Sequence, residues 1–222
     1  LTRYEEWLAQ FPTLDSLAAA PLSDVLHAWQ GLGYNRRAMA LKRSAEEIVT
    51  QHDGRVPQDT KELLALPGIG PATAAGVRVF AYGEHDVYLE TNVRAVILHE
   101  VFADRDDVSD REIVPVLQEL LALVDDAREW TYALMDYGAH LKSQVPNPSR
   151  RSRHHTRQST FEGSRRQKRA RLLRAVLAAP GIDVESLLAD QEWDEETVRS
   201  ILSDMADEGM LQERDERWFV PE

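Results

Sequence analysis

Apolar residues recur every three, four and seven positions along most of the chain, which is the spacing of amphipathic α-helices. Glycine and proline interrupt this pattern at intervals and mark where helices end. The pattern predicts helices over residues 1–10, 13–19, 21–30, 36–51, 60–66, 71–82, 91–101, 110–123 and 128–142. We therefore expect an all-α body up to residue 142.

The pattern changes between residues 143 and 166, where prolines, serines and arginines replace the apolar periodicity, and we expect a loop or linker there. Helical spacing then returns over residues 167–179, 184–189 and 195–208. Two short apolar segments flank Asp215-Glu216 and predict a hairpin. Three helices followed by a hairpin is the order of a winged-helix unit. The predicted domains are a helical core over 1–142, a basic linker over 143–166 and a small winged-helix-like α+β unit over 167–222.

Charge is distributed unevenly along the chain. The formal net charge is −12, but residues 142–174 contain eleven lysines and arginines and a single acid, Glu162. From chain totals of 26 basic and 38 acidic residues, this leaves 15 basic and 37 acidic side chains elsewhere. A basic segment on an otherwise acidic protein indicates a localised nucleic-acid contact, and a solvated linker between domains is the alternative.

The chain contains no cysteine, which excludes disulfides, thiolate-ligated zinc, cysteine-ligated iron–sulfur clusters and a cysteine nucleophile. It has neither a run of about 18 apolar residues nor a leader-like start. We therefore expect no membrane partner and a cytoplasmic location, at the nucleoid. His154 and His155 are adjacent but lack a spaced third ligand, which is typical of surface residues, so no metal ligand is predicted.

The segment Leu66-Pro67-Gly68-Ile69-Gly70-Pro71 lies between two predicted helices. Its two glycines permit backbone conformations closed to other residues and leave the amides accessible, and the second proline fits the first turn of the next helix. The amides and the positive end of that helix would converge on one point, which suits a phosphate of the DNA backbone. A tight turn without a ligand is the alternative.

Several separated motifs occur in the order found in one known family. They are Trp29-Gln30-Gly31-Leu32-Gly33-Tyr34, Leu66 to Ala75 (LPGIGPATAA), Phe80-Ala81-Tyr82-Gly83, Glu90-Thr91-Asn92-Val93-Arg94 and Ala133-Leu134-Met135-Asp136-Tyr137-Gly138-Ala139. With these motifs, residues 1–142 resemble the helix-hairpin-helix (HhH-GPD) DNA glycosylase superfamily, in particular its MutY-like adenine glycosylase and endonuclease III branch. The resemblance implies an all-α core of two helical lobes and, as partner, double-stranded DNA with a damaged or mispaired base.

The resemblance also implies a catalytic carboxylate about twenty residues after the hairpin, where this chain has Glu90 in place of the usual aspartate. A carboxylate beside the deoxyribose stabilises the positive charge that develops there as the base departs. The added methylene shifts this carboxylate by about 1 Å, which can cost about a hundredfold in rate unless the pocket compensates. The alternative is that Glu90 only caps the helix that follows it.

Two positions depart from the family pattern. Bifunctional relatives carry a lysine that attacks the sugar where this chain has Ala72, so we expect no lyase step. Asn35 stands where the MutY branch has a tyrosine that wedges into the base stack, which leaves the preference for adenine open. The general acid of that branch lies on a helix that would precede residue 1, so we expect a further N-terminal piece and assign no residue to this role.

The family's four-cysteine iron–sulfur loop would begin near Lys142, and all of its ligands are absent. We expect no cluster and no other cofactor, apart from a monovalent cation that the resemblance implies as a candidate at the hairpin carbonyls. Arginine- and serine-rich runs stand in place of the loop and are expected to contact phosphates. The predicted DNA-binding residues are Asn35, Leu66, Gly68, Ile69, Gly70, Ala72, Thr73, Arg150, Arg151, Arg153, Arg157, Arg165 and Arg166.

The third predicted helix of the winged-helix-like unit, 195–208, carries five acids and a single arginine, Arg199. Repulsion from phosphates argues against the DNA-reading role that such a helix usually has. We expect a scaffold role or a protein partner for this unit, with Trp193 and Trp218 as core anchors.

The sequence therefore predicts a monofunctional DNA glycosylase of base excision repair, which flips a base out of the duplex and hydrolyses its N-glycosidic bond with Glu90 as electrostatic partner. Adenine mispaired with 8-oxoguanine or guanine is the favoured substrate. Thymine or uracil mismatched with guanine is the alternative substrate. A catalytically silent DNA-binding protein is the alternative from another class.

Overall fold

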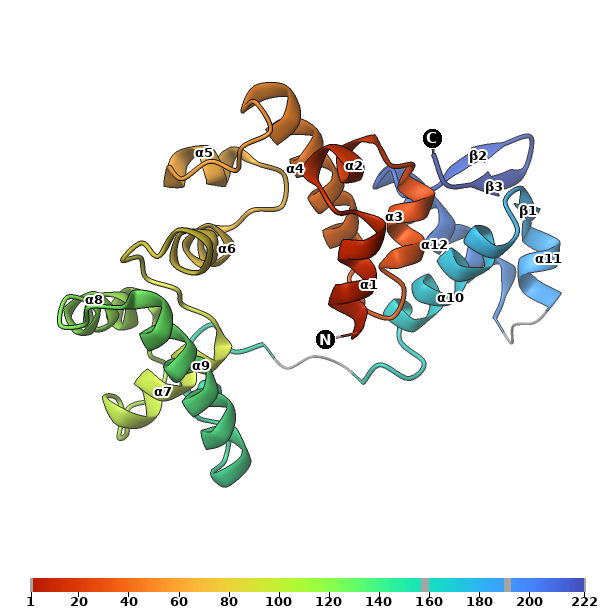
Figure 1. Ribbon diagram of the computed structural model, residues 1–222. Helices are drawn as coiled ribbons and strands as arrows, with labels where there is room; N and C mark the ends of the chain where they lie inside the picture. Colours follow the sequence, from red (N-terminus) through yellow and green to blue (C-terminus); the bar gives the residue numbers. More distant parts are fainter. Residues whose placement is uncertain (1, 157–159, 190–192, 222) are drawn as a thin grey trace. The chain divides into compact units, whose positions relative to one another are not determined.

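The computed structural model describes residues 2–156, 160–189 and 193–221. The chain forms two compact units, one from residues 1–56 together with 158–222 and one from residues 57–157. Nearly all regular structure in the described residues is helical, with one small three-stranded sheet near the C-terminus (Figure 1). The predicted fold class, an all-α core with a small C-terminal α+β part, is confirmed.

The first unit contains the helices at the two ends of the chain. Its N-terminal helices are α1 (Thr2–Gln10), α2 (Leu14–Ala19), α3 (Leu22–Ala28) and α4 (Arg36–Gln51). Its C-terminal elements are α10 (Arg165–Ala178), β1 (Ile182–Asp183), α11 (Val184–Ala189), α12 (Glu195–Asp207), β2 (Gln212–Arg214) and β3 (Arg217–Phe219). The strands are antiparallel in the order β1-β3-β2, so the predicted hairpin forms and β1 adds a strand that its two residues were too short to predict.

One apolar core joins both ends of the chain in this unit. Leu26 and Met39 from the N-terminal helices belong to the same buried cluster as Leu172, Met205 and Trp218 from the C-terminal elements. Trp218 is buried and Trp193 packs against the cluster, as expected of core anchors. The structure therefore groups the chain differently from the predicted domains, because the winged-helix-like segment buries its apolar face against α1 to α4 rather than alone.

Two arginines form ion pairs with a C-terminal glutamate and so add polar contacts between the two ends of the chain. Glu208, directly after α12, accepts hydrogen bonds from Arg36 of α4 and from Arg169 of α10. The Arg36 hydrogen bond, followed by that of Arg169, lowers the pKa of Glu208 from 4.5 to about 2. An ion pair between Arg165 and Asp204, at 2.5 Å, adds a second link between α10 and α12.

The helices and helical turns of the second unit are joined by irregular segments, and one parallel β-bridge pairs Val108 with Ser152 in its described residues. The unit contains α5 (Thr60–Ala65), α6 (Pro71–Gly76), a π-helical turn (Val77–Ala81), α7 (Thr91–Glu100), α8 (Asp110–Leu121), α9 (Ala127–Gln144) and a 3₁₀ turn (Pro148–Arg151). Val93, Ile97 and Leu98 of α7 pack against Ile113 and Leu117 of α8 in its core. The predicted helix 71–82 has the expected extent, but its second half is π-helical, a form that the apolar spacing does not distinguish.

Part of the predicted linker is folded onto the second unit. We call residues 147–153 the strap. Ser149 is 3% exposed and its hydroxyl donates to the Thr91 carbonyl at 3.1 Å. The Arg151 guanidinium donates to carbonyls at the end of α7, including that of Leu98 at 2.5 Å. The strap is thus a loop with one 3₁₀ turn, and its serine and arginine side chains attach it to backbone carbonyls of the second unit.

None of the helices in the described stretches combines the length and the apolar content that crossing a lipid bilayer requires.

Candidate DNA interface and active site

The glycine-containing hairpin connects α5 to α6 within the second unit. Leu66 ends α5 and its side chain is buried, at 4% exposure. Its carbonyl accepts the Ile69 amide at 3.2 Å, which closes the turn. Gly68 has a φ of 72°, a conformation that favours glycine over any residue with a β-carbon. The turn therefore explains the first of the two glycines.

The second glycine, Gly70, is not explained by the fold. Its backbone is extended, and nothing lies within 4 Å of the position that a β-carbon would occupy. Gly70 is the N-cap of α6 and supplies no side-chain cap, while the amides of Ala72 and Thr73 have no acceptor within the described residues. Ala72 and Thr73 are also exposed. The start of α6 therefore presents unused donors beside an unobstructed backbone.

Glu90 lies at the start of α7 and caps it. Its Oε1 accepts the amide of Asn92 at 2.6 Å and that of Val93 at 3.0 Å. The capping role considered from the sequence is thus present. Its Oε2 has no hydrogen bond to any described residue, and it is not among their buried unpartnered atoms, so solvent reaches it. One oxygen fixes the carboxylate, and the other remains available.

The first turn of α7 is held in place by α9 and by the strap. A β-carbon on Gly138 of α9 would overlap the carbonyl of Asn92, so the two backbones are in direct contact. Ser149 binds the Thr91 carbonyl from the strap. Arg94 adds a two-point ion pair with Asp110 of α8, both bonds at 2.9 Å. Glu90 is therefore attached to a rigid part of the unit.

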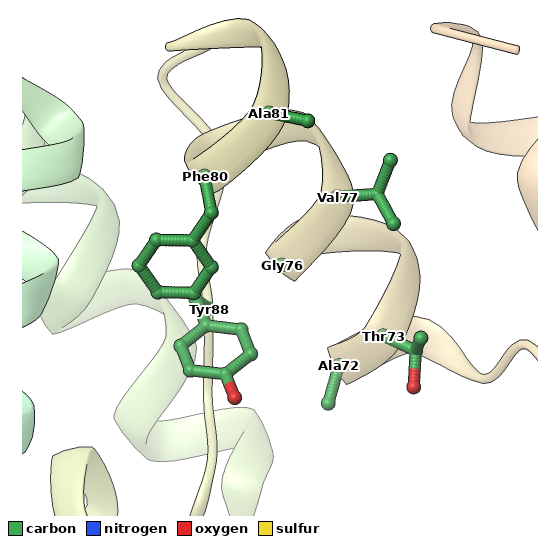
Figure 2. Close-up of a pocket in the computed structure, with 7 residues that line it drawn as sticks. All are labelled: Ala72, Thr73, Gly76, Val77, Phe80, Ala81 and Tyr88. Carbon is green, nitrogen blue, oxygen red and sulfur yellow. The ribbon is translucent and has the colours of Figure 1, made fainter. Parts of the chain in front are cut away.

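A pocket of about 400 Å³ opens beside α6 and is lined by Ala72, Thr73, Gly76, Val77, Phe80, Ala81 and Tyr88 (Figure 2). The sequence did not point to Tyr88 or to Gly76. Two features of the sequence could have indicated them. Tyr88 is an aromatic residue two positions before Glu90, and Gly76 is a glycine inside an apolar helical pattern, where glycine is unfavourable. Burial, and to a smaller extent the Glu90 carboxylate, raise the pKa of the Tyr88 phenol.

The predicted phosphate-binding arginines have different surroundings. Arg150 is exposed, and its guanidinium has no partner within the described residues. Arg151 binds carbonyls after α7, and Arg153 forms a 2.7 Å ion pair with Asp107. Arg165 is paired with an acid of α12, as described above, and Arg166 contacts the Tyr34 hydroxyl. Arg157 lies outside the described residues.

The predicted site residues are divided between the two units. The hairpin residues, Glu90 and Arg150 to Arg153 belong to the second unit. Asn35, Arg165 and Arg166 belong to the first. Asn35 is the N-cap of α4 and makes no side-chain cap.

The donor set of the strap does not fit an iron–sulfur cluster, because it contains no cysteine and its polar groups bind the surrounding backbone and Asp107. Within the described stretches, no three histidine, cysteine or acidic side chains are arranged to hold a metal ion. His154 and His155 are exposed, as expected of surface residues. The monovalent cation at the hairpin carbonyls stays a prediction.

Comparison with known proteins places the chain in a family. The HhH-GPD superfamily base excision DNA repair profile matches residues 1–138. The adenine DNA glycosylase of Mycobacterium tuberculosis is 32% identical over 249 residues, which cover 100% of this chain and 79% of that protein. That of Mycolicibacterium smegmatis is 38% identical over 136 residues, or 61% of this chain and 46% of that protein.

A solved structure supports the same fold. The structure of a thermostable thymine-DNA glycosylase superposes with a TM-score of 0.54 and 22% sequence identity, over 66% of this chain and 69% of the other. At that identity the likeness concerns the fold alone. The family profile and the sequence matches show that this chain belongs to the HhH-GPD superfamily of base excision DNA repair proteins, with adenine DNA glycosylases among its relatives.

Proposed function

We propose that this protein is a monofunctional DNA glycosylase that removes adenine mispaired with 8-oxoguanine or guanine from chromosomal DNA. The observation that carries the proposal is the start of α6, where Gly70 leaves open space and two exposed amides lack acceptors. An external acceptor of the size and charge of a phosphate fits this arrangement. Adenine is favoured because the similar proteins from Mycobacterium tuberculosis and Mycolicibacterium smegmatis are adenine DNA glycosylases.

DNA binding through this hairpin depends on its backbone. The amides of Ala72 and Thr73 would donate to one phosphate, and the missing β-carbon of Gly70 would let that phosphate approach. Leu66 contributes only through its backbone, because its side chain is buried. Arg150 is free to reach a second phosphate, whereas Arg151 and Arg153 mainly hold the strap in place.

The chemical step is hydrolysis of the bond between the base nitrogen and C1′ of the deoxyribose. As this bond breaks, its electron pair leaves with the base, which takes up a proton, and positive charge develops on the sugar. The available oxygen of Glu90 stabilises that charge. Water then bonds to C1′ and releases a proton, leaving an abasic site. Ala72 provides no amine for attack on C1′, so the strand stays intact.

A second candidate function is a DNA-binding protein that performs no chemistry. It is favoured by the two amide hydrogen bonds that Glu90 accepts, because they account for this carboxylate without catalysis. The two functions predict the same duplex binding and differ only in the fate of the glycosidic bond.

The experiment that separates the two functions uses the natural full-length protein, and compares the wild type with Glu90→Gln on duplexes containing A, T or U opposite G, or A opposite 8-oxoguanine. Glutamine retains a side-chain oxygen for the two α7 amides but removes the negative charge. We expect single-turnover excision of adenine to fall by about 10² to 10³ while duplex affinity is unchanged. Glu119→Gln, an exposed position on α8, is the matched control and should behave as wild type.

Three results would contradict the proposal. Tight binding without excision on any duplex would establish the silent DNA-binding protein. Preferential excision of thymine or uracil would replace adenine as the substrate. Strand cleavage without added alkali would show a lyase step and disprove monofunctional hydrolysis.

A further inference from the structure

Helix α10 of the first unit carries six lysines and arginines and no acid (Figure 1). These cations fall into two groups. Arg165 and Arg169 pair with acids in and directly after α12, so their charge is neutralised within the fold. Lys168 and Arg174 form no ion pair with an acid in the described part of the chain. Like charges three positions apart on a helix repel one another, so this side of α10 favours an external partner of negative charge.

A hollow of about 380 Å³ lies on the same side of the helix, and we call it the α10 hollow. It is lined by Arg171, Arg174, Ala175 and Ala178. Each arginine is followed by an alanine four positions later, which places the alanine one turn further along the same side of the helix. The leucines and the valine of α10 are buried in the core of the first unit. The hollow is therefore bordered by charged side chains, has methyl groups at its base, and is lined by no other described element.

The ring of Trp193 holds the cations at one end of the hollow. Nζ of Lys168 lies 5.5 Å from the ring centre, and Cζ of Arg171 lies 5.9 Å from it. Trp193 in turn packs against the apolar core. A cation that already lies on a fixed ring loses less side-chain freedom when a ligand binds. This end of the hollow is therefore partly arranged for an acceptor before one arrives.

The surroundings of the hollow favour a narrow acidic chain over a DNA duplex. Asp194 follows Trp193 directly and caps α12, and the first turn of that helix adds Glu195 and Glu196. A duplex is rigid and carries one charge per about 1.7 Å of its axis, so it would bring further phosphates towards these acids. The methyl groups of Ala175 and Ala178 offer no hydrogen bond to a phosphate, whereas an apolar side chain gains from being buried against them.

We propose that the α10 hollow is a docking site for an acidic peptide segment of a partner protein. An apolar side chain of the segment fills the hollow, and carboxylates on either side of it pair with Lys168 and Arg174. This inference goes beyond the proposed function, because it assigns to the C-terminal part of the first unit a binding role that is separate from the hairpin and from Glu90.

The experiment measures peptide binding to the natural full-length protein by fluorescence anisotropy. The probe is a fluorescein-labelled peptide in which one leucine is flanked by aspartates, and a second peptide has serine in place of the leucine. Arg174→Glu reverses a charge beside the hollow, and Ala178→Leu fills the hollow, both at exposed positions. The matched controls are Arg111→Glu on α8 and Ala9→Leu on α1, which are also exposed. Thermal unfolding verifies that each variant is folded.

We expect Arg174→Glu to weaken binding of the leucine peptide by about tenfold, because attraction to the aspartates becomes repulsion. Ala178→Leu should weaken it by about threefold to tenfold, because the new side chain occupies the space of the peptide's leucine. The serine peptide should bind the wild type about tenfold more weakly than the leucine peptide, since it buries no apolar side chain. Both control variants should bind as the wild type does.

Four results would overturn the inference. Equal binding of the serine and leucine peptides would show that the hollow takes no apolar side chain. Wild-type affinity in both α10 variants would place the peptide elsewhere on the protein. Displacement of the peptide by an undamaged duplex, together with weaker duplex binding by Arg174→Glu, would make DNA the occupant. Dimers in sedimentation that Arg174→Glu dissociates would make a second copy of the chain the occupant. None of these measurements requires excision, so failure of the proposed function would be seen separately.

Discussion

The starts of α6 and α7 lie in the same unit and solve the same problem in opposite ways. The first amides of any helix lack intrahelical acceptors. At α7, Glu90 satisfies two of them with one carboxylate oxygen. At α6, Gly70 offers no side chain and the amides of Ala72 and Thr73 remain unused. The first amides of α7 therefore have an acceptor within the protein, whereas those of α6 have none among the described residues, and we propose that DNA supplies it.

The same contrast separates the two glycines of the hairpin. Gly68 adopts a positive φ that the turn requires, so the fold explains why a glycine is needed at this position. Gly70 has an extended backbone and free space around it, so the turn does not account for it. One glycine shapes the hairpin, and we propose that the other leaves room for a phosphate.

The largest loss of stability is expected from Gly138→Ala, because Gly138 of α9 packs directly against the first turn of α7. The added methyl group would overlap the Asn92 carbonyl, and backbone cannot move aside as a flexible side chain can. We expect a loss of roughly 1–3 kcal/mol in the free energy of unfolding, the usual cost of overpacking. Excision should fall as well, because the turn that carries Glu90 shifts.

Urea unfolding of the two proteins measures this loss. His140→Ala, on an exposed position of the same helix, is the control and should change stability by less than about 0.5 kcal/mol. Wild-type stability in Gly138→Ala would show that α7 and α9 do not depend on this backbone contact.

Substituting the hairpin glycines one at a time should separate folding from binding. Gly68→Ala places a β-carbon on a left-handed residue and should cost about 1–2 kcal/mol of stability. Gly70→Ala should leave the free energy of unfolding nearly unchanged but weaken duplex binding by about tenfold, because the methyl group occupies the space of the phosphate. Thermal unfolding and fluorescence anisotropy of labelled duplex provide the two measurements. Unaltered duplex affinity in Gly70→Ala would remove the hairpin from the DNA interface.

The smallest predicted effect is on the pH dependence of stability, and it concerns a third helix start, that of α8. There a glutamate of the helix itself is the hydrogen-bond acceptor. Glu112 accepts the amide and the hydroxyl of Ser109, which with Arg105 lowers its pKa from 4.5 to about 2. Because the folded value lies below the unfolded one, this contribution is complete above about pH 4.5 and is lost as the pH falls towards 2. Glu208 in the first unit should show the same window.

Urea midpoints between pH 7 and pH 2 test this expectation. Stability should be level down to about pH 5 and then decrease. Glu112→Gln keeps an acceptor for Ser109 but removes the titrating group, so its decrease should be shallower than that of the wild type. An identical slope in the variant would assign the acid sensitivity to other carboxylates.

Much of the fold was predictable because its determinants are local. Helices such as α4 and α8 follow from apolar spacing, and caps such as Asp59 and Asp126 stand directly before their helices. The hairpin before α6 was predictable from two glycines and a proline for the same reason. The position of Glu90 at the start of α7 was also predictable, although the division of its two oxygens between cap and solvent was not, and its catalytic role stays a proposal.

The strap and the position of Tyr88 depend on partners that are distant in sequence. Ser149 and Arg151 are polar residues in a basic run, and the sequence of that run does not predict that α7 lies within hydrogen-bonding distance. Tyr88 lines a pocket only because Gly76 permits its approach and Phe80 fixes its ring.

The sequence by itself determined where helices start and stop, which residues form the hairpin, and that no thiolate is available for a cluster. These features depend on backbone conformation and residue type within a few neighbouring positions. Only the tertiary structure decided that the two ends of the chain share one core, that most of the described predicted arginines are already engaged by the protein itself, and that Tyr88 borders the space beside the hairpin. Those features arise from packing between distant segments, which apolar periodicity alone does not encode.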